Sequence, residues 1–383
     1  MVYNPFKFGK EVSGDQFYDR TEVADDLYRM LASGSANVVI AAPRRYGKSS
    51  LVMKVLERFR AEGVACFCID LSRAKSLENF CEDYASAVYS VGGKVHEVVH
   101  TVGDFLSRLH PTISFGTGSL PVTVKFDYEA RITDSALAEV LDLPERLSHQ
   151  MGDVPIVIAF DEFQDVGSLS RDLALEKIFR SCIQAHRNVR YVFLGSKTHL
   201  MARMFNREAS PFYKSALSIK LGKPPADESR AFVRARFQSA GRQVSDAVLE
   251  RILAESQNIP YYLQAVAALT FDAMLAGDRS EPTMEDVDKA CARITEGSSD
   301  AWEQQVREMS DAQRRLASAL AESPTGEFGE AYRLRFRLGA YSTVRSALKT
   351  LQDDGVVSES GRVCSLADPF FARYLKTSSV LLD

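Results

Sequence analysis

Apolar residues in the first half of the chain fall into short runs separated by helical stretches. The runs near residues 37–42, 64–70, 154–160 and 189–195 are predicted strands. Between them the apolar positions recur with a helical period, and a further helix is predicted from about Thr21 to Leu31. Strands that alternate with helices indicate a parallel sheet covered on both faces, so the predicted fold class is α/β.

The segment from Val102 to Phe126 interrupts this alternation. Two short stretches, Ile113 to Phe115 and Val122 to Phe126, alternate on either side of Gly116-Thr117-Gly118-Ser119. The pattern predicts a β-hairpin insertion near residues 111–127. The insertion serves either as a contact for a partner or as a decoration of the core.

Beyond Pro224-Pro225 the pattern becomes purely helical. Helical periodicity covers Asp227 to Ala240, Ser245 to Ser256, Pro260 to Ala276 and Thr283 to Thr295. We therefore expect a core domain over residues 1–223 and a helical lid domain over residues 224–300.

The remaining residues, 301–383, show a third pattern. Helices are predicted at Asp311 to Ala321, Glu330 to Phe336 and Tyr341 to Gln352, followed by a hairpin around Ser360-Gly361. Three helices and a hairpin are typical of a winged-helix domain, whose third helix can read a DNA major groove. We expect few exposed basic residues on that helix, chiefly Arg345 and Lys349. Residues 310–383 carry ten Lys or Arg and nine Asp or Glu, so packing or protein contact is an equal expectation.

Composition is that of a soluble globular protein, with 45% hydrophobic and 26% charged residues. No apolar run reaches the roughly 18 residues of a transmembrane helix, so no membrane partner is expected. The first residues lack the apolar stretch of a secretory signal, and the six cysteines form no CxxC pair, which favours a cytoplasmic protein. A net charge of −4 does not favour nucleic-acid binding by the whole surface, but it leaves a local basic patch open.

A phosphate-binding loop is predicted between the first strand and the next helix, in the string Ala42-Pro43-Arg44-Arg45-Tyr46-Gly47-Lys48-Ser49-Ser50. In such a P-loop, backbone N–H groups and the helix N-terminus face the phosphates of ATP or GTP. We expect Lys48 to reach the β- and γ-phosphates and Ser49 to ligate Mg²⁺. Ala42 replaces the first glycine of the motif, whereas Gly47, where the backbone approaches phosphate, is intact.

Two later strands end in further candidate residues. The apolar strand from Ile156 ends in Asp161-Glu162, which is a Walker B pattern. Asp161 is expected to hold the Mg²⁺ shell and Glu162 to polarise the attacking water. The strand from Tyr191 ends at Ser196, and ligands bind at strand C-termini in parallel sheets. Ser196 would contact the γ-phosphate or the water as a sensor-1 residue, or else cap the helix from Thr198 to Phe205.

One string indicates a different chemistry. His96-Glu97-Val98-Val99-His100 matches the H-E-x-x-H signature of zinc proteases, in which the glutamate is the general base. Its β-branched residues favour a helix poorly, and Gly92-Gly93 and Gly103 bracket it closely. Solvated histidines on a helix are the preferred interpretation, with a zinc site as the alternative.

Taken together, the motifs resemble the prokaryotic "archaeal-type" ATPases, which belong to the MNS group of STAND ATPases and are relatives of AAA+ proteins. The resemblance covers nearly the whole chain and rests on Asn4-Pro5-Phe6, Phe17-Tyr18-Asp19-Arg20, residues 42–51, 160–164, 194–196, 210–213 and 258–263, and the tail 366–374. It implies a P-loop core, a helical lid over the nucleotide and a C-terminal winged helix.

The resemblance also implies residue roles. Arg20 would line the adenine or ribose end of the nucleotide. Pro260 and Tyr261 stand where the family's G-x-P motif meets the base, with Asn258 in place of its glycine, although Pro260 also suits the first position of a helix. Arg44 and Arg45 would stabilise transition-state charge, contact a neighbouring subunit's nucleotide or form salt bridges. Arg207 is a candidate arginine finger in trans.

The expected site therefore has three sets of residues. Glu162, Lys48 and Ser196 are the candidate catalytic residues, and Ser49 and Asp161 the candidate Mg²⁺ ligands. The nucleotide-binding set is Pro43, Arg44, Arg45, Tyr46, Gly47, Lys48, Ser49, Ser50, Arg20, Pro260 and Tyr261.

The favoured function is an Mg²⁺-dependent ATP-binding and ATP-hydrolysing switch, slow or activated by a partner, in which ATP and ADP set different positions of the lid and winged helix. The partner is a second protein or another copy of the chain. One alternative is a DNA-binding protein that uses the winged helix under ATP control. The other is a protein-interaction scaffold in which the nucleotide only sets conformation.

Overall fold

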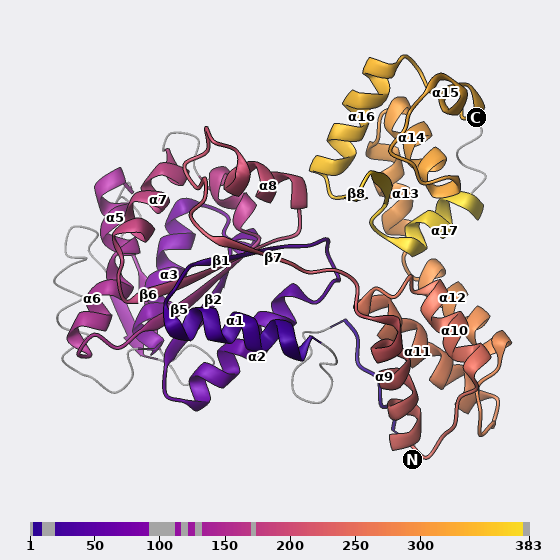
Figure 1. The fold of residues 1–383 in the computed structure, drawn as a ribbon, viewed down its shortest axis with the longest axis horizontal. Helices are drawn as coiled ribbons and strands as arrows, with labels where there is room; N and C mark the ends of the chain where they lie inside the picture. Colours follow the sequence, from indigo (N-terminus) through magenta and orange to yellow (C-terminus); the bar gives the residue numbers. More distant parts are fainter. Residues whose placement is uncertain are drawn as a thin grey trace.

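The computed structural model describes residues 3–9, 20–91, 112–115, 122–126, 132–169 and 174–377. They form an α/β core unit, a helical unit and a winged-helix unit, which follow one another along the chain (Figure 1). None of the described helices combines the length and apolarity needed to cross a membrane.

The core unit is built on a five-stranded sheet with the order β2-β5-β6-β1-β7. Its strands are β1 (Val38–Ala41), β2 (Ala65–Asp70), β5 (Ile156–Asp161), β6 (Val189–Gly195) and β7 (Leu217–Lys220). Every neighbouring pair is parallel, which confirms the predicted α/β class. The sequence predicts four of these strands and misses β7, a short edge strand whose side chains are mostly exposed and therefore lack an apolar run.

Helices cover both faces of the sheet. Alternate side chains of β5 point to opposite faces, so Phe160 joins one hydrophobic cluster and Ala159 the other. One face packs against α1 (Thr21–Ser33) and α2 (Lys48–Ala61), and the other against α3 (Leu77–Val91), α5 (Asp134–Leu141), α6 (Leu143–Gln150) and α7 (Leu175–Ala185). Short 3₁₀ turns, Leu71–Arg73 and Phe163–Ser168, follow β2 and β5.

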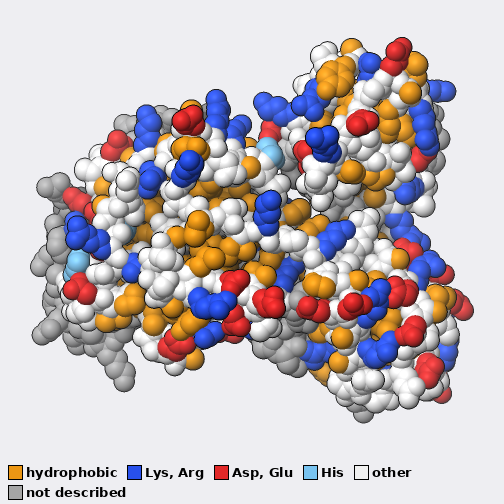
Figure 2. Space-filling model, in the orientation of Figure 1, with side chains coloured by type: hydrophobic (Ala, Val, Ile, Leu, Met, Phe, Trp, Pro, Cys, Tyr) orange, Lys and Arg blue, Asp and Glu red, His pale blue; other side chains and the backbone are white. Residues whose placement is uncertain are grey.

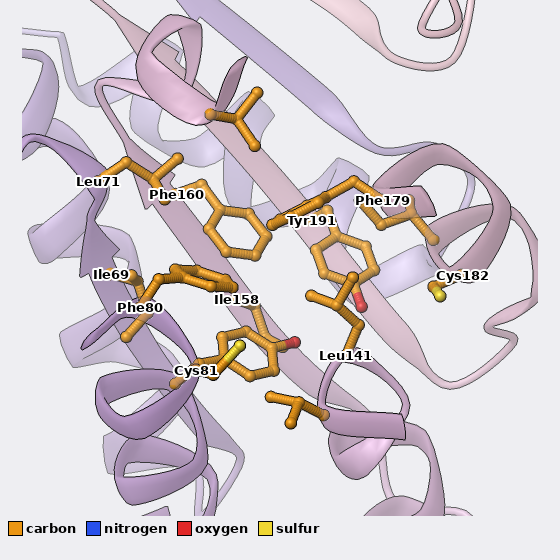
Figure 3. Close-up of a cluster of buried hydrophobic side chains, with 14 of the residues drawn as sticks. Ile69, Leu71, Phe80, Cys81, Leu141, Ile158, Phe160, Phe179, Cys182 and Tyr191 are labelled. Atoms are coloured by element: carbon orange, nitrogen blue, oxygen red, sulfur yellow. The ribbon is translucent and has the colours of Figure 1, made fainter. Parts of the chain in front are cut away.

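Aromatic rings fill the second face (Figure 3). The rings of Phe160 and Tyr191, on neighbouring strands, stack with centroids 6.0 Å apart. Phe80 of α3 and Phe179 of α7 close over them, with centroids 5.4 Å apart. This packing fixes β5 and β6 relative to each other, and with them the residues at their carboxyl ends.

The predicted hairpin insertion is present as β3 (Thr112–Phe115) paired antiparallel with β4 (Val122–Lys125). It docks on α3: the Val124 N–H donates to Ser86 Oγ at 2.8 Å, and Lys125 Nζ donates to Glu82 at 2.6 Å. The zinc-protease string, residues 96–100, lies outside the described residues, as do Phe17 to Asp19.

The helical unit confirms the four predicted helices as α9 (Ala226–Ser239), α10 (Asp246–Glu255), α11 (Pro260–Ala276) and α12 (Met284–Glu296). The N-terminal residues 3–9 pack on this unit. Phe6 is 5% exposed, and its ring contacts Phe237 and Phe271. Asn4 Nδ2 donates to the Ala268 carbonyl at 2.9 Å. The first residues, expected with the core, therefore contribute to the hydrophobic cluster of the helical unit.

The winged-helix unit contains the three predicted helices and hairpin, and two helices that the sequence pattern misses. The predicted elements are α14 (Asp311–Glu322), α15 (Glu330–Arg335), α16 (Tyr341–Asp353), β8 (Val357–Ser360) and β9 (Val363–Leu366), and the additional helices are α13 (Ser299–Glu308) and α17 (Pro369–Thr377). Thr325 bridges to Cys364 beside the hairpin. The next residue must be glycine, because a Cβ on Gly326 would lie 1.5 Å from the Arg362 carbonyl oxygen.

The helical and winged-helix units share one hydrophobic cluster. The Tyr262 ring of α11 lies 5.2 Å from the Phe370 ring of α17, centroid to centroid. Phe371, also on α17, contacts Trp302 of α13, with ring centroids 5.9 Å apart. Apolar packing therefore joins these two units.

Candidate nucleotide-binding site

The candidate site lies at the carboxyl ends of three neighbouring strands, β1, β5 and β6. The predicted P-loop follows β1, Asp161-Glu162 ends β5, and Ser196 follows β6. Because the strands are parallel, their carboxyl ends meet at one edge of the sheet. The fold thus brings together residues that are far apart in the sequence.

The P-loop backbone enters the left-handed region twice, at Arg45 (φ 71°) and Gly47 (φ 80°). Glycine adopts this conformation without strain, and Gly47 directly precedes α2. Ala42, in place of the motif's first glycine, is 1% exposed, and its N–H donates to the Gly195 carbonyl at 3.2 Å. The small alanine side chain is therefore accommodated in the packed strand end.

Lys48 is buried inside the loop, with 5% of its surface exposed. Its Nζ donates to the carbonyl oxygens of Ala42 at 2.8 Å and Pro43 at 3.2 Å. Burial lowers the pKa of Lys48, while Glu162 and Asp161 act in the opposite direction. A buried ammonium is costly unless it is paired, so this position favours an anionic ligand.

Ser49 and Asp161 form a direct pair, in which the Ser49 hydroxyl donates to Asp161 Oδ2 at 2.6 Å. Burial raises the pKa of Asp161, and the Ser49 hydrogen bond partly offsets this effect. These hard oxygen donors suit Mg²⁺, which proteins hold through one or two carboxylates together with substrate phosphates. The described residues contain no cluster of three His, Cys, Asp or Glu that would enclose a metal unaided. Phosphate oxygens and waters would therefore complete the Mg²⁺ shell.

Glu162 is held by three donors. Its Oε2 accepts from the Ser196 N–H at 3.0 Å, the Ser196 hydroxyl at 2.7 Å and Gln164 Nε2 at 2.6 Å. Burial acts to raise the pKa of Glu162, but the donors from Gln164 and Ser196 outweigh it and the pKa is lowered. Glu162 also has a left-handed backbone, with φ of 50°. Such strain in a non-glycine residue is common at functional sites.

The Ser196 hydroxyl therefore orients Glu162. The capping alternative is wrong: α8 (Thr198–Asn206) has Lys197 at its N-cap and no side-chain cap. Contact of Ser196 with a γ-phosphate stays a prediction. The role of Gln164 was missed, and its position within the Walker B string is the only signal that would have drawn attention to it.

Arg20 contacts two segments of backbone. It is 8% exposed, and its guanidinium donates to the Tyr46 carbonyl of the P-loop and, at 2.7 Å, to the Gly222 carbonyl that precedes the helical unit. Arg20 thus links the loop to the entry of the helical unit. Its contact with adenine or ribose stays a prediction.

Arg45 lies where the three units meet. Its guanidinium forms an ion pair with Asp368 of the winged-helix unit. It also lies 5.1 Å from the Tyr261 ring centroid and 4.9 Å from that of Tyr262, both in α11. Its carbonyl accepts from the Tyr261 N–H at 3.4 Å. Of the roles expected for Arg45, the salt bridge is the one that the structure contains.

Sequence reasoning missed both Asp368 and Tyr262 as site residues. Each also has a second function in the fold, which for Tyr262 is its packing on Phe370. Asp368 Oδ1 accepts the N–H groups of Phe370 at 2.9 Å and Phe371 at 3.1 Å, at the start of α17. Burial raises the pKa of Asp368, and Arg45 acts against this. The tail string 366–374 contains Asp368, but nothing in it identifies Arg45 as its partner.

Pro260 occupies the first position of α11, as its alternative interpretation predicts. Asn258 has a φ of 55°, in the region that favours glycine and that asparagine tolerates. Asn258 therefore has a backbone conformation that a glycine at this position would adopt without strain. Base contacts of Pro260 and Tyr261 stay predictions.

A cavity of about 370 Å³ separates the P-loop from the winged-helix unit. Its core side includes Arg44 and Ser196, and its winged-helix side includes Gln352 and Glu359. At one end His199 of α8 forms an ion pair with Asp353, the last residue of α16. The cavity opens next to the predicted γ-phosphate position, and Arg44 is exposed there.

The comparisons with known proteins agree with this architecture. A family model described as "Probable winged helix domain" matches residues 300–377. None of the curated proteins is matched by this sequence. Among solved structures, the Walker-type ATPase PABY2304 of Pyrococcus abyssi is similar with a TM-score of 0.70 at 18% identity, over 97% of this chain and 99% of that one.

Two Aeropyrum pernix structures are also similar at 13% identity. The ORC2 protein, solved in ADPNP–ADP complexes, has a TM-score of 0.56 over 97% of this chain and 96% of its own. The ORC1 protein, solved with DNA, has a TM-score of 0.51 over 96% and 94%. The chain therefore has the fold of Walker-type P-loop ATPases, with a C-terminal winged helix.

Proposed function

We propose that the protein binds Mg²⁺-ATP at this site and hydrolyses it slowly, and that the nucleotide sets the position of the helical and winged-helix units relative to the core. The observation that carries the proposal is the convergence of Lys48, the Ser49–Asp161 pair and Glu162 at neighbouring strand ends. Four residue types required for phosphoryl transfer lie in one site.

The P-loop would bind the phosphates through its backbone N–H groups and the N-terminus of α2. Lys48 would exchange the carbonyls of Ala42 and Pro43 for phosphate oxygens. Ser49 and Asp161 would hold Mg²⁺, which supplies charge neutralisation at the phosphates when bound. The ADPNP–ADP complexes of the similar ORC2 protein support an adenine nucleotide here.

Glu162 would orient the attacking water. Because its Oε2 already accepts three hydrogen bonds and its pKa is lowered, the carboxylate is a weak base. This supports slow turnover that rises when a partner or a second copy rearranges Ser196 or Gln164. Arg45 supports the conformational role, because it belongs to the P-loop and contacts both other units.

The test is hydrolysis of ATP and GTP with Mg²⁺ over a range of protein concentrations, in wild type and in Glu162→Gln. We expect turnover specific to ATP, and a loss of about 10²- to 10⁴-fold in Glu162→Gln with ATP binding retained. Glu303→Gln, on the far helix α13, is the matched control and should hydrolyse normally.

Wild-type turnover in Glu162→Gln would contradict the proposed role of this carboxylate. Absence of ATP binding by the wild type would contradict the whole function. A rate per molecule that rises with concentration would support self-association and a trans contribution from Arg207, which is exposed at the end of α8.

A further inference from the structure

Charge is segregated within the winged-helix unit. Residues 331–352, which span all of α15 after its first residue Glu330 and nearly all of α16, contain five Lys or Arg and no Asp or Glu. In the whole chain acidic residues outnumber basic ones, 51 to 47, so this positive segment is a local feature. It coincides with the two helices and the turn between them.

One face of α16 is exposed along its length. Val344, Ala347, Leu348 and Leu351 are buried in the unit, whereas Ser342, Arg345, Ser346 and Lys349 are exposed at helical spacing. The short serine side chains allow another surface to approach the helix axis closely, between the two basic side chains.

A groove runs beside this face. Arg345, Lys349 and Arg362 line a cavity of about 680 Å³ between α16 and the β8–β9 hairpin. Two acids, Glu327 and Glu359, also line it, and Glu359 accepts a hydrogen bond from Gln352 at 3.3 Å. Three positive charges from two elements therefore face one concave surface.

Arg345, Lys349 and Arg362, which we call the basic face, form no ion pair with any of the described residues, and neither does Arg337 in the turn before α16. Other arginines of the same unit are paired: Arg307 with Glu303, and Arg314 with Asp311. Although Glu327 and Glu359 line the same groove, neither is within ion-pair distance of these basic side chains, which therefore remain available to an external anion. The expected exposed basic residues of this helix, Arg345 and Lys349, are confirmed, and Arg362 of the hairpin lines the same groove.

Two other acids of the unit, Asp353 and Asp368, lie on the side that faces the core. Asp353 pairs with His199 and Asp368 with Arg45, so carboxylates face the P-loop. Lys and Arg side chains project beside α16 at the upper right of the molecule (Figure 2). The unit thus docks on the core through acids and leaves the N-terminal half of α16 exposed.

We propose that the basic face binds duplex DNA, with the N-terminal half of α16 in the major groove and Arg337 and Arg362 on the phosphate backbone. The B-DNA major groove, about 12 Å wide, admits a helix whose exposed face is short and polar. The major groove of duplex RNA is too deep and narrow for this. The regular row of phosphates matches positive charge spread over a helix, the turn before it and a hairpin. The proposal goes beyond the ATPase function and does not depend on it.

The test is fluorescence anisotropy of a labelled 20-base-pair duplex over a series of salt concentrations, with nucleotide-free protein. For Arg345→Ala/Lys349→Ala we expect affinity to fall at least about 30-fold, and the slope of log affinity against log salt to fall by about two. The matched control, Arg234→Ala/Lys289→Ala on α9 and α12, removes the same charge and should bind within about twofold of wild type. Arg345→Lys/Lys349→Arg should retain most of the affinity.

Three outcomes would overturn the proposal: absence of salt-dependent duplex binding near 50 mM salt, an equal loss in both double alanine variants, or polyglutamate competing as well as DNA. The last outcome would indicate an acidic protein partner. Equal binding of duplex RNA would exclude docking in the major groove. Thermal melting of each variant verifies folding, and Lys48→Ala should bind DNA as wild type does, which separates this proposal from the ATPase function.

Discussion

The winged-helix unit contacts its two neighbours in different ways. Towards the helical unit it buries aromatic side chains, with Phe370 and Phe371 of α17 at most 2% exposed. Towards the core its side-chain contacts are polar: the ion pairs Arg45–Asp368 and His199–Asp353. The first junction excludes water, and the second adjoins a cavity.

The difference predicts which junction would open more easily. Full burial of a large apolar side chain contributes about 1.5–3 kcal/mol, whereas an exposed ion pair contributes about 0–1 kcal/mol. The helical and winged-helix units are therefore expected to move as one body against the core. Because Arg45 belongs to the P-loop, phosphate binding would act directly on the weaker junction.

The largest effect is expected where the apolar junction is broken. Phe370→Ala should lower the free energy of unfolding by about 3–5 kcal/mol, because it leaves a cavity between α17 and Tyr262. Urea denaturation followed by circular dichroism measures this loss. Leu334→Ala is the control, since Leu334 is 72% exposed and its truncation should cost about 0.5 kcal/mol or less. A loss under about 1 kcal/mol in Phe370→Ala would mean that the junction is not a packed core.

A smaller effect is expected at the polar junction. Arg45→Ala removes the Asp368 ion pair and the contacts with Tyr261 and Tyr262, together worth about 1–2 kcal/mol. Energy transfer between dyes on Lys177→Cys and Lys376→Cys should fall in the nucleotide-free protein, while overall folding is retained.

The neighbouring variant Arg44→Ala provides the control for Arg45→Ala. Arg44 is exposed and forms no ion pair with the described residues, so its removal should leave energy transfer unchanged. Equal transfer in both variants would show that Arg45 does not hold the junction.

Asp368→Asn separates docking from stability. Burial raises the pKa of Asp368, so the ionised carboxylate is a net cost to the fold that is fully present above the raised pKa and disappears as pH falls through it to the ordinary pKa. The variant should dock more weakly than wild type yet unfold at no lower temperature at neutral pH. The difference in stability between the two proteins should shrink on acidification, and melting curves at several pH values test this. An Asp368→Asn variant that is less stable than wild type at neutral pH would contradict the predicted sign of the stability change.

The smallest effect is expected for His199→Ala. Both partners of its ion pair with Asp353 are about one-third exposed, so the contribution should be at most about 1 kcal/mol. Alone, the variant should lower energy transfer only slightly. Combined with Arg45→Ala it should add to the loss, because the two pairs hold the same junction. A double variant that equals Arg45→Ala would show that the His199 pair does not contribute.

Local pattern predicted most of the secondary structure. Four core strands, the helices of the helical unit and the winged-helix hairpin follow from short-range periodicity, which backbone geometry imposes within a few residues. The edge strand β7 could not be predicted this way, because its side chains are mostly exposed and leave no apolar run. The helices α13 and α17 were also missed, and both bury aromatic residues against distant elements.

In the candidate site, too, some features are visible in the sequence and others are not. The P-loop, Asp161-Glu162 and Ser196 are visible in the sequence because their chemistry requires fixed residue types at strand ends. The hydrogen bonds from Gln164 and Ser196 to Glu162 are not visible in the sequence, because they depend on where a strained backbone directs the Glu162 carboxylate.

The sequence by itself determined the α/β class, the loop with its lysine and serine, the paired acids and the winged-helix pattern, since each is encoded in neighbouring residues. Only the tertiary structure decided that Arg45 joins three units, that Asp368 is its partner and that Arg345, Lys349 and Arg362 line one groove. The contacts of Arg45 link positions hundreds of residues apart, and all of these arrangements arise from packing, which local patterns do not encode.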